Sequence, residues 1–455
     1  GILSLVLAIL LVVLLLPQLN EITGKHLALS IDQKGFLCLG GIGLLTGLVS
    51  GIYPSFYLSR FRPAAVLKGK IDASLSELLV RKGLVIFQFV VSMIFIAGVM
   101  VVTRQMEFIQ NKNLGYSRSH VISFPWKGNV ANRSDDRKSD QSFFTFLSNL
   151  RNIPGVVAVS NMSGNILNEI YGQTDVSWRG EDADKAFLFQ SPVVGYDFMK
   201  TLEIEVIAGR AFSRERQDDY SKIILNEAAV KKMGLEDPVG ETIGMNGTSE
   251  IVGVVKDFNY GSLHDKIEPL IFRFDPRGRN VILKIVQGSE RVAIEQIKNT
   301  YEEFLPGYVF EYAFMDDEYQ ALYESENRIA HLSRYSSGMA IIISCLGLLG
   351  LVHFTVQARL REIGIRKVLG SNVSQIVWML VRNLSKTVIY AIIVGLPIGY
   401  LIMNVWLDQF AYSIELGWEL FLVAGLCTLL IAWITVSVQT IKAALINPVN
   451  FLRNE

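Results

Sequence analysis

Residues Ala358 to Gln375 read ARLREIGIRKVLGSNVSQ and lie between two long apolar segments. The stretch alternates apolar and charged residues at roughly helical spacing. Its apolar positions are Leu360, Ile363, Val368 and Leu369, and its polar positions are Arg359, Arg361, Glu362, Arg366 and Lys367. Gly370 is suited to end this helix, and Ser371 is suited to cap the next one. The sequence therefore predicts a short amphipathic helix at a turn between two spanning helices.

Apolar runs of membrane-spanning length occur on both sides of this turn. They are Phe36–Tyr57, Gly83–Thr103, Ser336–Gln357, Ile376–Met403 and Trp418–Val438, and each suffices for a hydrocarbon core of about 30 Å. A shorter run, Gly1–Leu16, lacks the basic region and cleavage motif of a signal peptide. Because the chain opens on Gly, we expect this run to be the end of a truncated spanning helix.

The distribution of basic residues predicts the orientation in the membrane. The segment Ser59–Lys82 carries an excess of Lys and Arg over acidic residues, and so do residues 358–375 and the C-terminal tail. The connections Gln18–Lys34 and Asp408–Glu415 lack this excess. Basic loops face the cytoplasm, so the long segment from about Arg104 to Arg334 is expected on the outer side.

The membrane part contains an internal repeat. FRPAAVLK, from Phe61 to Lys68, resembles INPVNFLR, from Ile446 to Arg453, and each follows a spanning helix. Internal duplication is common among membrane transporters. We therefore expect residues 1–70 to be the end of a first half, and residues from about 80 to 455 to be a complete second half.

The outer segment is predicted to be an α+β domain. Two strand–helix–strand units share a Pro-Gly connector and indicate a ferredoxin-like pair split by an insertion. The first unit is Val121–Phe124, Gln141–Leu150 and Val156–Ser160, and the second is Val281–Val286, Glu290–Leu305 and Tyr308–Tyr312. The insertion, about residues 170–275, is β-rich, and Asn246-Gly247 predicts a hairpin within it. Met315–Arg334 is expected to be one polar helix leading back to the membrane.

No pattern in the sequence predicts catalysis, a cofactor or a metal. The histidines are scattered, and there is no H-E-x-x-H, G-x-S-x-G or phosphate-binding P-loop motif. Cys38, Cys345 and Cys427 fall inside predicted spans, which argues against a disulfide framework or a cysteine zinc site. Lys+Arg and Asp+Glu number 43 each, so bulk charge gives no indication of nucleic acid binding. Any ATP would have to be bound by a separate subunit.

Several polar residues have a structural and a functional interpretation. Gln88 and Ser92, four apart in a predicted span, favour hydrogen bonding between helices over lining a path. Asp257, Asp265, Asp316 and Asp317 are interpreted as surface or turn residues, with Asp316 and Asp317 at a helix start. For residues 358–375, a loop that only enforces topology and a helix that docks a partner protein both remain open.

The turn also resembles the signature of a known family. Arg361-Glu362-Ile363-Gly364-Ile365-Arg366-Lys367-Val368-Leu369-Gly370, directly after a spanning helix, is similar to that of MacB/FtsX-type ABC transporter permeases. Four outer stretches resemble the family's periplasmic domain: Ala208–Phe212, Ile224–Ala229, Pro238–Gly240 and Ile251–Phe258. The duplicated layout is similar to double-length permeases of Bacteroidota.

The resemblance implies a non-catalytic permease subunit in the inner membrane of a bacterium, with its large domain in the periplasm. A dimeric ATPase would bind the cytoplasmic helix through residues 361–370, and the motion would reach the outer domain through Gly83–Thr103 and Ser336–Gln357. This mechanotransmission would serve export or efflux, with a possible periplasmic adaptor or effector. The alternative is a non-transporting FtsX-like regulator or sensor that acts on a periplasmic partner.

Together, the sequence patterns and the resemblance predict six segments. Residues 1–70 are the last two transmembrane helices of a truncated FtsX-like half, 71–82 a cytoplasmic linker, and 83–103 a transmembrane helix. Residues 104–334 form a MacB-like periplasmic core domain with a ferredoxin-like porter part and a β-rich insertion. Residues 335–445 form an FtsX-like three-helix transmembrane domain with its coupling helix at 358–371, and 446–455 are a cytoplasmic tail.

Overall fold

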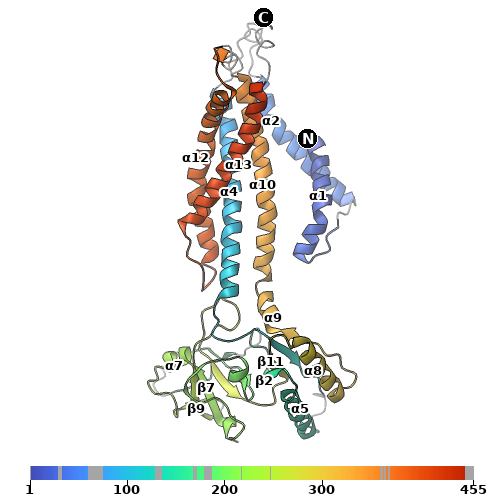
Figure 1. Cartoon of the computed structure of the whole chain (residues 1–455), viewed down its shortest axis with the longest axis vertical. Helices are drawn as coiled ribbons and strands as arrows, with labels where there is room; N and C mark the ends of the chain where they lie inside the picture. Colours follow the sequence, from blue (N-terminus) through green and yellow to red (C-terminus); the bar gives the residue numbers. More distant parts are fainter. Residues whose placement is uncertain are drawn as a thin grey trace. The chain divides into compact units, whose positions relative to one another are not determined.

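A computed structural model describes residues 2–28, 33–59, 75–128, 136–167, 172–178, 187–216, 218–245, 247–358, 362, 365–366 and 369–445. These residues form two compact units, shown in Figure 1. The helical unit comprises residues 1–104, 326–406 and 415–455, and the α/β unit comprises residues 105–325 and 407–414. The repeated segments at 61–68 and 446–453, from which duplication was predicted, lie outside the described residues.

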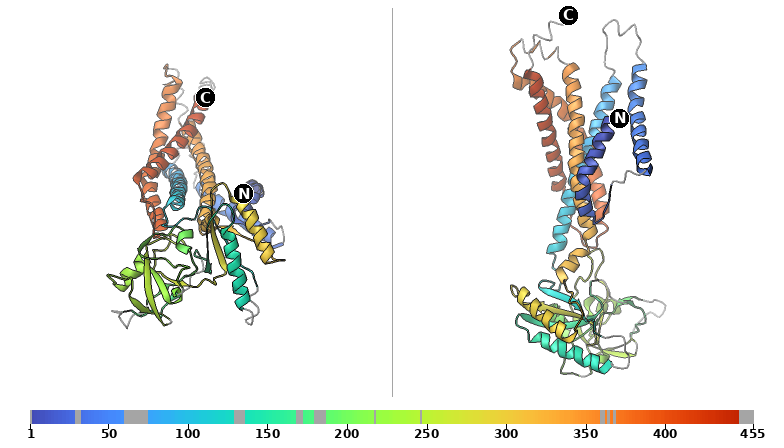
Figure 2. Two further views of the ribbon diagram at one scale, coloured as in Figure 1. Left: turned by 60° about the horizontal axis from the view of Figure 1, so that its bottom comes forward. Right: turned by 90° about the vertical axis from the view of Figure 1, so that its right-hand side faces the viewer.

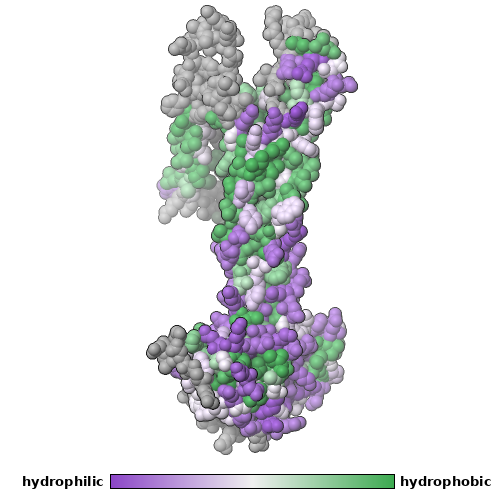
Figure 3. Space-filling model, turned by 90° about the vertical axis from the view of Figure 1, so that its left-hand side faces the viewer, coloured by the Kyte–Doolittle hydropathy of each residue, from purple (hydrophilic) through white to green (hydrophobic). Residues whose placement is uncertain are grey.

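The helical unit is built from long apolar helices. They are α1 (Ile2–Thr23), α2 (Gln33–Ser59), α4 (Leu75–Asn111), α10 (Glu324–Ala358), α12 (Val373–Leu407) and α13 (Trp418–Leu445). Among the described residues, five helices are long and apolar enough to cross a membrane, and α2 has a shorter apolar stretch at Leu37–Ile52. Figure 3 shows hydrophobic side chains over the middle of these helices. The predicted spans are therefore helical.

Four of these helices share one apolar core. Its buried side chains come from α4, α10, α12 and α13, and Ile376, Leu380, Leu384 and Val388 of α12 supply one continuous stripe. Their spacing of four residues places them on one face of the helix. Between helices in a membrane such packing acts through van der Waals contact and interhelical hydrogen bonds, because lipid is itself apolar.

The α/β unit contains the predicted ferredoxin-like fold. Its elements are β1 (Val121–Pro125), α5 (Asp136–Arg151), β2 (Val156–Ser163), β11 (Asn280–Ile285), α8 (Glu290–Phe304) and β12 (Ala313–Phe314). The strands lie in the order β12-β1-β11-β2, and every neighbouring pair is antiparallel. This order is that of a split βαβ pair, although the fourth strand is only two residues long.

The insertion continues this sheet. Its strands are β5 (Val193–Val194), β6 (Val206–Gly209), β7 (Lys222–Asn226), β8 (Thr242–Gly244), β9 (Thr248–Val255) and β10 (Ile271–Phe274). They follow β2 in the order β5-β10-β7-β9-β6, with β8 paired to β9. The strands β8 and β9 form the predicted hairpin, and Gly247 at its turn has φ +119°. A separate two-stranded sheet joins β3 (Gly172–Gln173) to β4 (Phe189–Gln190).

Short helices complete the α/β unit. They are α6 (Phe198–Thr201), the 3₁₀ turn η1 (Asp219–Ser221), α7 (Glu227–Met233) and α9 (Met315–Ala321). The longer helices α5 and α8 lie side by side against the ferredoxin-like part, as Figure 2 shows. An aromatic cluster fills the space between them and the sheet. Phe146 and Tyr301 are in ring contact with each other and with both Phe124 and Trp126. This cluster buries large apolar area at a small cost in side-chain entropy.

Two secondary-structure predictions were wrong. Residues 308–312 are irregular instead of a strand. Tyr308, Val309 and Tyr312 are exposed, so the alternating aromatic and apolar residues do not form a buried strand face. Phe310 alone anchors the stretch, with its ring 5.0 Å from that of Phe124. The predicted single helix from Met315 is interrupted between α9 and α10 at buried Tyr323, whose hydroxyl accepts a hydrogen bond from Leu263 N at 2.7 Å.

Candidate functional site

The predicted coupling turn is described in part. Of the ten residues predicted to contact an ATPase, Glu362, Ile365, Arg366, Leu369 and Gly370 are among the described residues. Arg361, Ile363, Gly364, Lys367 and Val368 lie outside them. The described residues at 362, 365 and 366 are helical. The turn lies between α10, which ends at Ala358, and α12, which begins at Val373.

Gly370 ends the short helix as predicted. Its φ is +89°, and Ser371 N donates to Arg366 O at 2.9 Å. A left-handed glycine followed by this six-to-one hydrogen bond is the Schellman arrangement. The predicted cap of the next helix is off by one residue, because Asn372 and not Ser371 precedes α12. Gln375 Oε1 accepts from Asn372 N at 3.2 Å, as in a capping box.

The described part of the turn carries exposed apolar and charged side chains. Ile365 and Leu369, one helical turn apart, are 50% and 78% exposed. Glu362 and Arg366 form an i,i+4 ion pair at 2.9 Å between Glu362 Oε1 and Arg366 Nη2. Residues four apart lie on one face, so the apolar pair and the ion pair occupy neighbouring faces. The apolar face is available for contact with another molecule.

The helices α4 and α10 are joined directly. Ser92 Oγ of α4 and Ser344 Oγ of α10 are 2.9 Å apart and buried. The predicted interhelical role of Ser92 is therefore confirmed. Gln88 lies against Gly347, where a Cβ would fall 2.1 Å from Gln88 Oε1. Glycine thus allows the close approach of these two helices.

In the α/β unit, the motif Ala208–Phe212 has a structural role. Arg210 Nη2 donates to Asp219 Oδ1 at 2.7 Å, and Ser213 N donates to Asp219 Oδ2 at 2.7 Å. The Asp219 side chain is fully buried, and that of Arg210 is 27% exposed. Gly209 has φ +67°, and a Cβ there would fall 2.2 Å from Val252 O. The motif therefore joins β6 to β9 and η1.

Two further motifs meet at the start of α7. Asn226 is fully buried and caps α7 by accepting from Ala229 N at 2.9 Å. Its Oδ1 also accepts from Leu270 N at 2.8 Å, and its Nδ2 donates to Glu268 O at 3.0 Å. Asp257 Oδ1 accepts from Ala228 N at 2.9 Å, and burial raises the pKa of its carboxyl despite this bond. Asp257 is thus a partly buried anchor of a helix start and not simply a surface residue.

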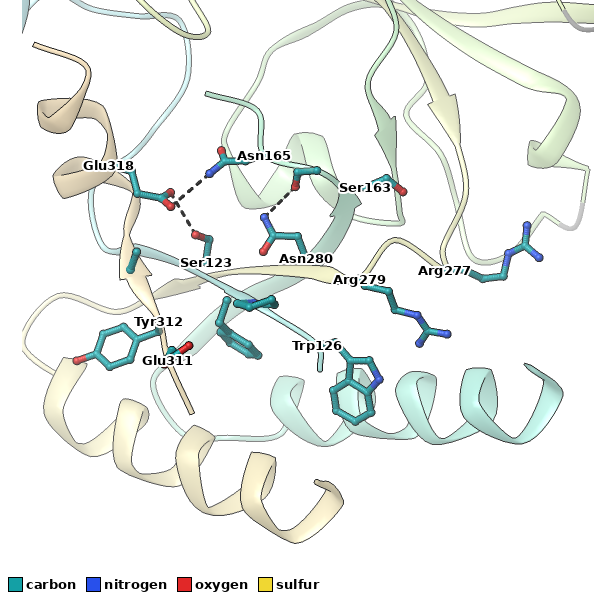
Figure 4. Close-up of a pocket in the computed structure, with 14 residues that line it drawn as sticks. Ser123, Trp126, Ser163, Asn165, Arg277, Arg279, Asn280, Glu311, Tyr312 and Glu318 are labelled. Atoms are coloured by element: carbon teal, nitrogen blue, oxygen red, sulfur yellow. Dashed lines mark hydrogen bonds between the residues drawn. The ribbon is translucent and has the colours of Figure 1, made fainter. Parts of the chain in front are cut away.

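The α/β unit also has a pocket of about 720 Å³. Figure 4 shows Glu318 facing Ser123 and Asn165, whose side chains donate to its carboxylate at 3.2 and 3.3 Å. Elsewhere on its wall, Arg277 and Arg279 are each paired with an aspartate. The lining residues include no histidine or cysteine, and the described residues contain no cluster that could hold a metal ion.

Two parts of the chain match known family models. Residues 83–295 match the family model of the MacB-like periplasmic core domain, and residues 335–448 match that of the FtsX-like permease C-terminal region. The periplasmic region of MacB from Actinobacillus actinomycetemcomitans has a similar solved structure. It is 15% identical, with a TM-score of 0.33, and the match covers 47% of this chain and 97% of that one.

Two curated relatives are also similar. The Macrolide export ATP-binding/permease protein MacB of Bdellovibrio bacteriovorus is 22% identical over 279 residues, which are 55% of this chain and 41% of that protein. An uncharacterized ABC transporter permease of Methanocaldococcus jannaschii is 21% identical over 325 residues, 66% of this chain and 79% of that protein. The chain thus matches less than half the length of the Bdellovibrio protein. It is a polytopic membrane protein with a large periplasmic domain, and it belongs to the MacB/FtsX-type ABC transporter permeases.

Proposed function

We propose that this chain couples ATP hydrolysis by a separate subunit to conformational work in its periplasmic α/β unit. The observation that carries the proposal is the exposed pair Ile365 and Leu369 on the turn between α10 and α12. Exposed apolar side chains at a helix terminus, beside an ion pair, suit insertion into a groove of a partner protein. The ATPase is the partner that the family membership favours.

The absence of a nucleotide site in this sequence supports a separate ATPase. The sequence contains no G-x-x-x-x-G-K-[ST] stretch, so it lacks the usual backbone cradle for phosphates. The name of the Bdellovibrio relative joins ATP binding and permease in one protein, of which this chain matches 41%. We infer that ATP is bound by a dimeric subunit on the cytoplasmic side of a bacterial inner membrane, and that this chain binds no cofactor itself.

The helices provide a route for motion. Chain continuity carries α4 and α10 from the helical unit into the α/β unit, at Gln105 and Glu324 respectively. The Ser92–Ser344 hydrogen bond and the shared core favour movement of α4 and α10 together. Among the described residues of the spanning helices, the buried polar side chains are all uncharged. Mechanical transmission needs no charged relay through the membrane, in contrast to ion-coupled transport.

We infer export as the work performed, because the name of the Bdellovibrio relative includes macrolide export. A periplasmic adaptor or effector would then bind the α/β unit. Reconstituted complexes with ATP should move a substrate outward in an ATP-dependent manner. A complex that instead activates a periplasmic partner, with no substrate moved, would establish the regulatory alternative.

The docking step is tested by changing Ile365 and Leu369 to Asp together. The doubly substituted full-length chain should insert into the membrane normally but retain less than a tenth of the ATPase subunit on affinity purification. Val309→Asp is the matched control, because Val309 is 69% exposed in the α/β unit. Undiminished ATPase recovery with the double variant would refute docking at this face.

A further inference from the structure

The loop after α12 belongs to the α/β unit. Residues Leu407–Ile414 join α12 to α13, yet they cluster with residues 105–325. A loop between two spanning helices needs only to reverse the chain. This one instead forms hydrogen bonds and a ring contact with residues about 150 to 310 positions earlier in the sequence.

Gln105 is the centre of these contacts. Its side chain is fully buried in the segment of α4 that belongs to the α/β unit. Gln105 Nε2 donates to Tyr412 O at 3.0 Å, and its Oε1 accepts from Ile414 N at 2.9 Å. One amide thus satisfies a carbonyl and an N–H of the loop, two groups that would be costly to bury unpaired.

A second set of contacts joins the loop to residues 263 and 264. Ala411 N donates to His264 O at 3.1 Å, and Tyr412 N donates to Leu263 O at 3.3 Å. The ring of Phe410 stacks on that of His264, with centroids 4.0 Å apart. The hydroxyl of Tyr323, at the break between α9 and α10, accepts from Leu263 N. The loop at 407–414, residues 263–264 and the junction between α9 and α10 therefore form one connected network.

We propose that Gln105 is a positioning residue that makes α12 a second lever, by fixing the outer end of α12 to the periplasmic α/β unit. The helix α12 begins three residues after Gly370, so displacement of the coupling turn enters it directly. It ends at Leu407, where the loop held by Gln105 begins. Without this attachment, the loop would not transmit movement of α12 and α13 to the α/β unit. The lever role rests on the proposed function, whereas the attachment can be tested alone.

The first experiment measures hydrogen exchange of the full-length chain in lipid nanodiscs, without any ATPase. The loop peptide containing the amides of Ala411, Tyr412 and Ile414 should be protected in the unaltered chain. Gln105→Met keeps the side-chain volume but removes two hydrogen bonds, and should accelerate exchange there about 30-fold. Gln110→Met, an exposed position on the same helix, should change nothing. An unprotected loop in the unaltered chain would overturn the attachment.

The second experiment repeats the measurement on the chain purified with its ATPase, with and without ATP and magnesium. The ATP-induced change in exchange at β7 and β9 should fall by half or more in Gln105→Met and persist in Gln110→Met. Phe410→Leu, which removes the ring stack and keeps an apolar side chain, should act in the same direction.

The outcomes separate the two hypotheses. An equal ATP response in Gln105→Met, although its loop has lost protection, overturns the lever role and leaves the proposed function standing. If ATP changes no exchange rate in the unaltered complex, the proposed function and the lever role are both refuted. The attachment is still tested by the first experiment.

Discussion

Removal of the buried carboxylate of Asp219 should destabilise the insertion of the α/β unit. Asp219 is fully buried between Arg210 and the backbone of Ser213. Asp219→Ala would leave a largely buried guanidinium and a backbone N–H without their partner. Uncompensated charge is the costly part of breaking a buried ion pair.

The expected loss of stability follows from the hydrogen bonds that Asp219 accepts. Asp219 accepts two short ones, each of 2.7 Å, from Arg210 Nη2 and Ser213 N, and a longer one of 3.3 Å from Arg210 Nη1. A hydrogen bond to a charged group contributes about 1.5–3 kcal/mol, so loss of the two short ones costs about 4 kcal/mol, within the range for broken buried pairs. Asp219→Asn keeps one acceptor and should cost about 2 kcal/mol.

Hydrogen exchange of the full-length chain in detergent measures this loss of stability directly. Peptides covering β7 and β9 adjoin the ion pair through η1 and β6. A loss of about 4 kcal/mol raises their exchange rate by about three orders of magnitude, and about 2 kcal/mol by about 30-fold, if exchange requires opening of this region.

A matched control separates burial from charge. Lys256 and Glu205 form a pair of similar length, 2.9 Å, with both side chains more than half exposed. Glu205→Ala should leave exchange of β7 and β9 unchanged, because exposed pairs contribute little. If Asp219→Ala behaves like Glu205→Ala, burial does not increase the contribution of the Arg210–Asp219 pair to stability.

Two further predictions concern the coupling turn and acid stability. Gly370→Ala places a Cβ on a residue with a left-handed backbone, where no other atom lies nearby. It should destabilise this helix end by about 1 kcal/mol and reduce ATPase recovery on affinity purification. Gly350→Ala is the control, because Gly350 also has no neighbouring atoms but lies within α10, and it should not reduce ATPase recovery. The hydrogen bond from Lys284 lowers the pKa of Glu203 below its ordinary value of 4.5, so its stabilisation is complete above that pH and is lost as pH falls through the folded-state value. Urea unfolding of the α/β unit, followed by tryptophan fluorescence from pH 7 to pH 3, should therefore show a shallower acid loss in Glu203→Gln; an identical acid limb would contradict this.

Local patterns predicted most of the elements. Each predicted apolar run became a helix, and five helices among the described residues have the length that a bilayer requires. The two strand–helix–strand units were recognisable because α5 and α8 each bury one face against the sheet. On α8, for example, Ile297 and Tyr301 lie on the buried face. Gly370 was recognisable as a helix end because its backbone conformation favours glycine, whatever surrounds it.

The predictions that failed were those in which a local pattern depended on distant partners. The aromatic alternation from Tyr308 to Tyr312 is typical of a strand, but only Phe310 packs against the core, where it is partly buried. The break before α10 occurs where Tyr323 meets Leu263, a contact that helical periodicity does not encode. The roles of the α/β motifs likewise depend on pairs such as Arg210 with Asp219.

The sequence by itself determined the membrane helices, the helix end at Gly370, the ferredoxin-like halves and the absence of a P-loop. These are properties of residues close together in the chain, where period, length and backbone preference act. Only the tertiary structure decided that the insertion extends one sheet, that Asp219 is buried and that Gln105 binds the loop at 407–414. Those contacts join residues separated by up to about 300 positions, and packing brings them together.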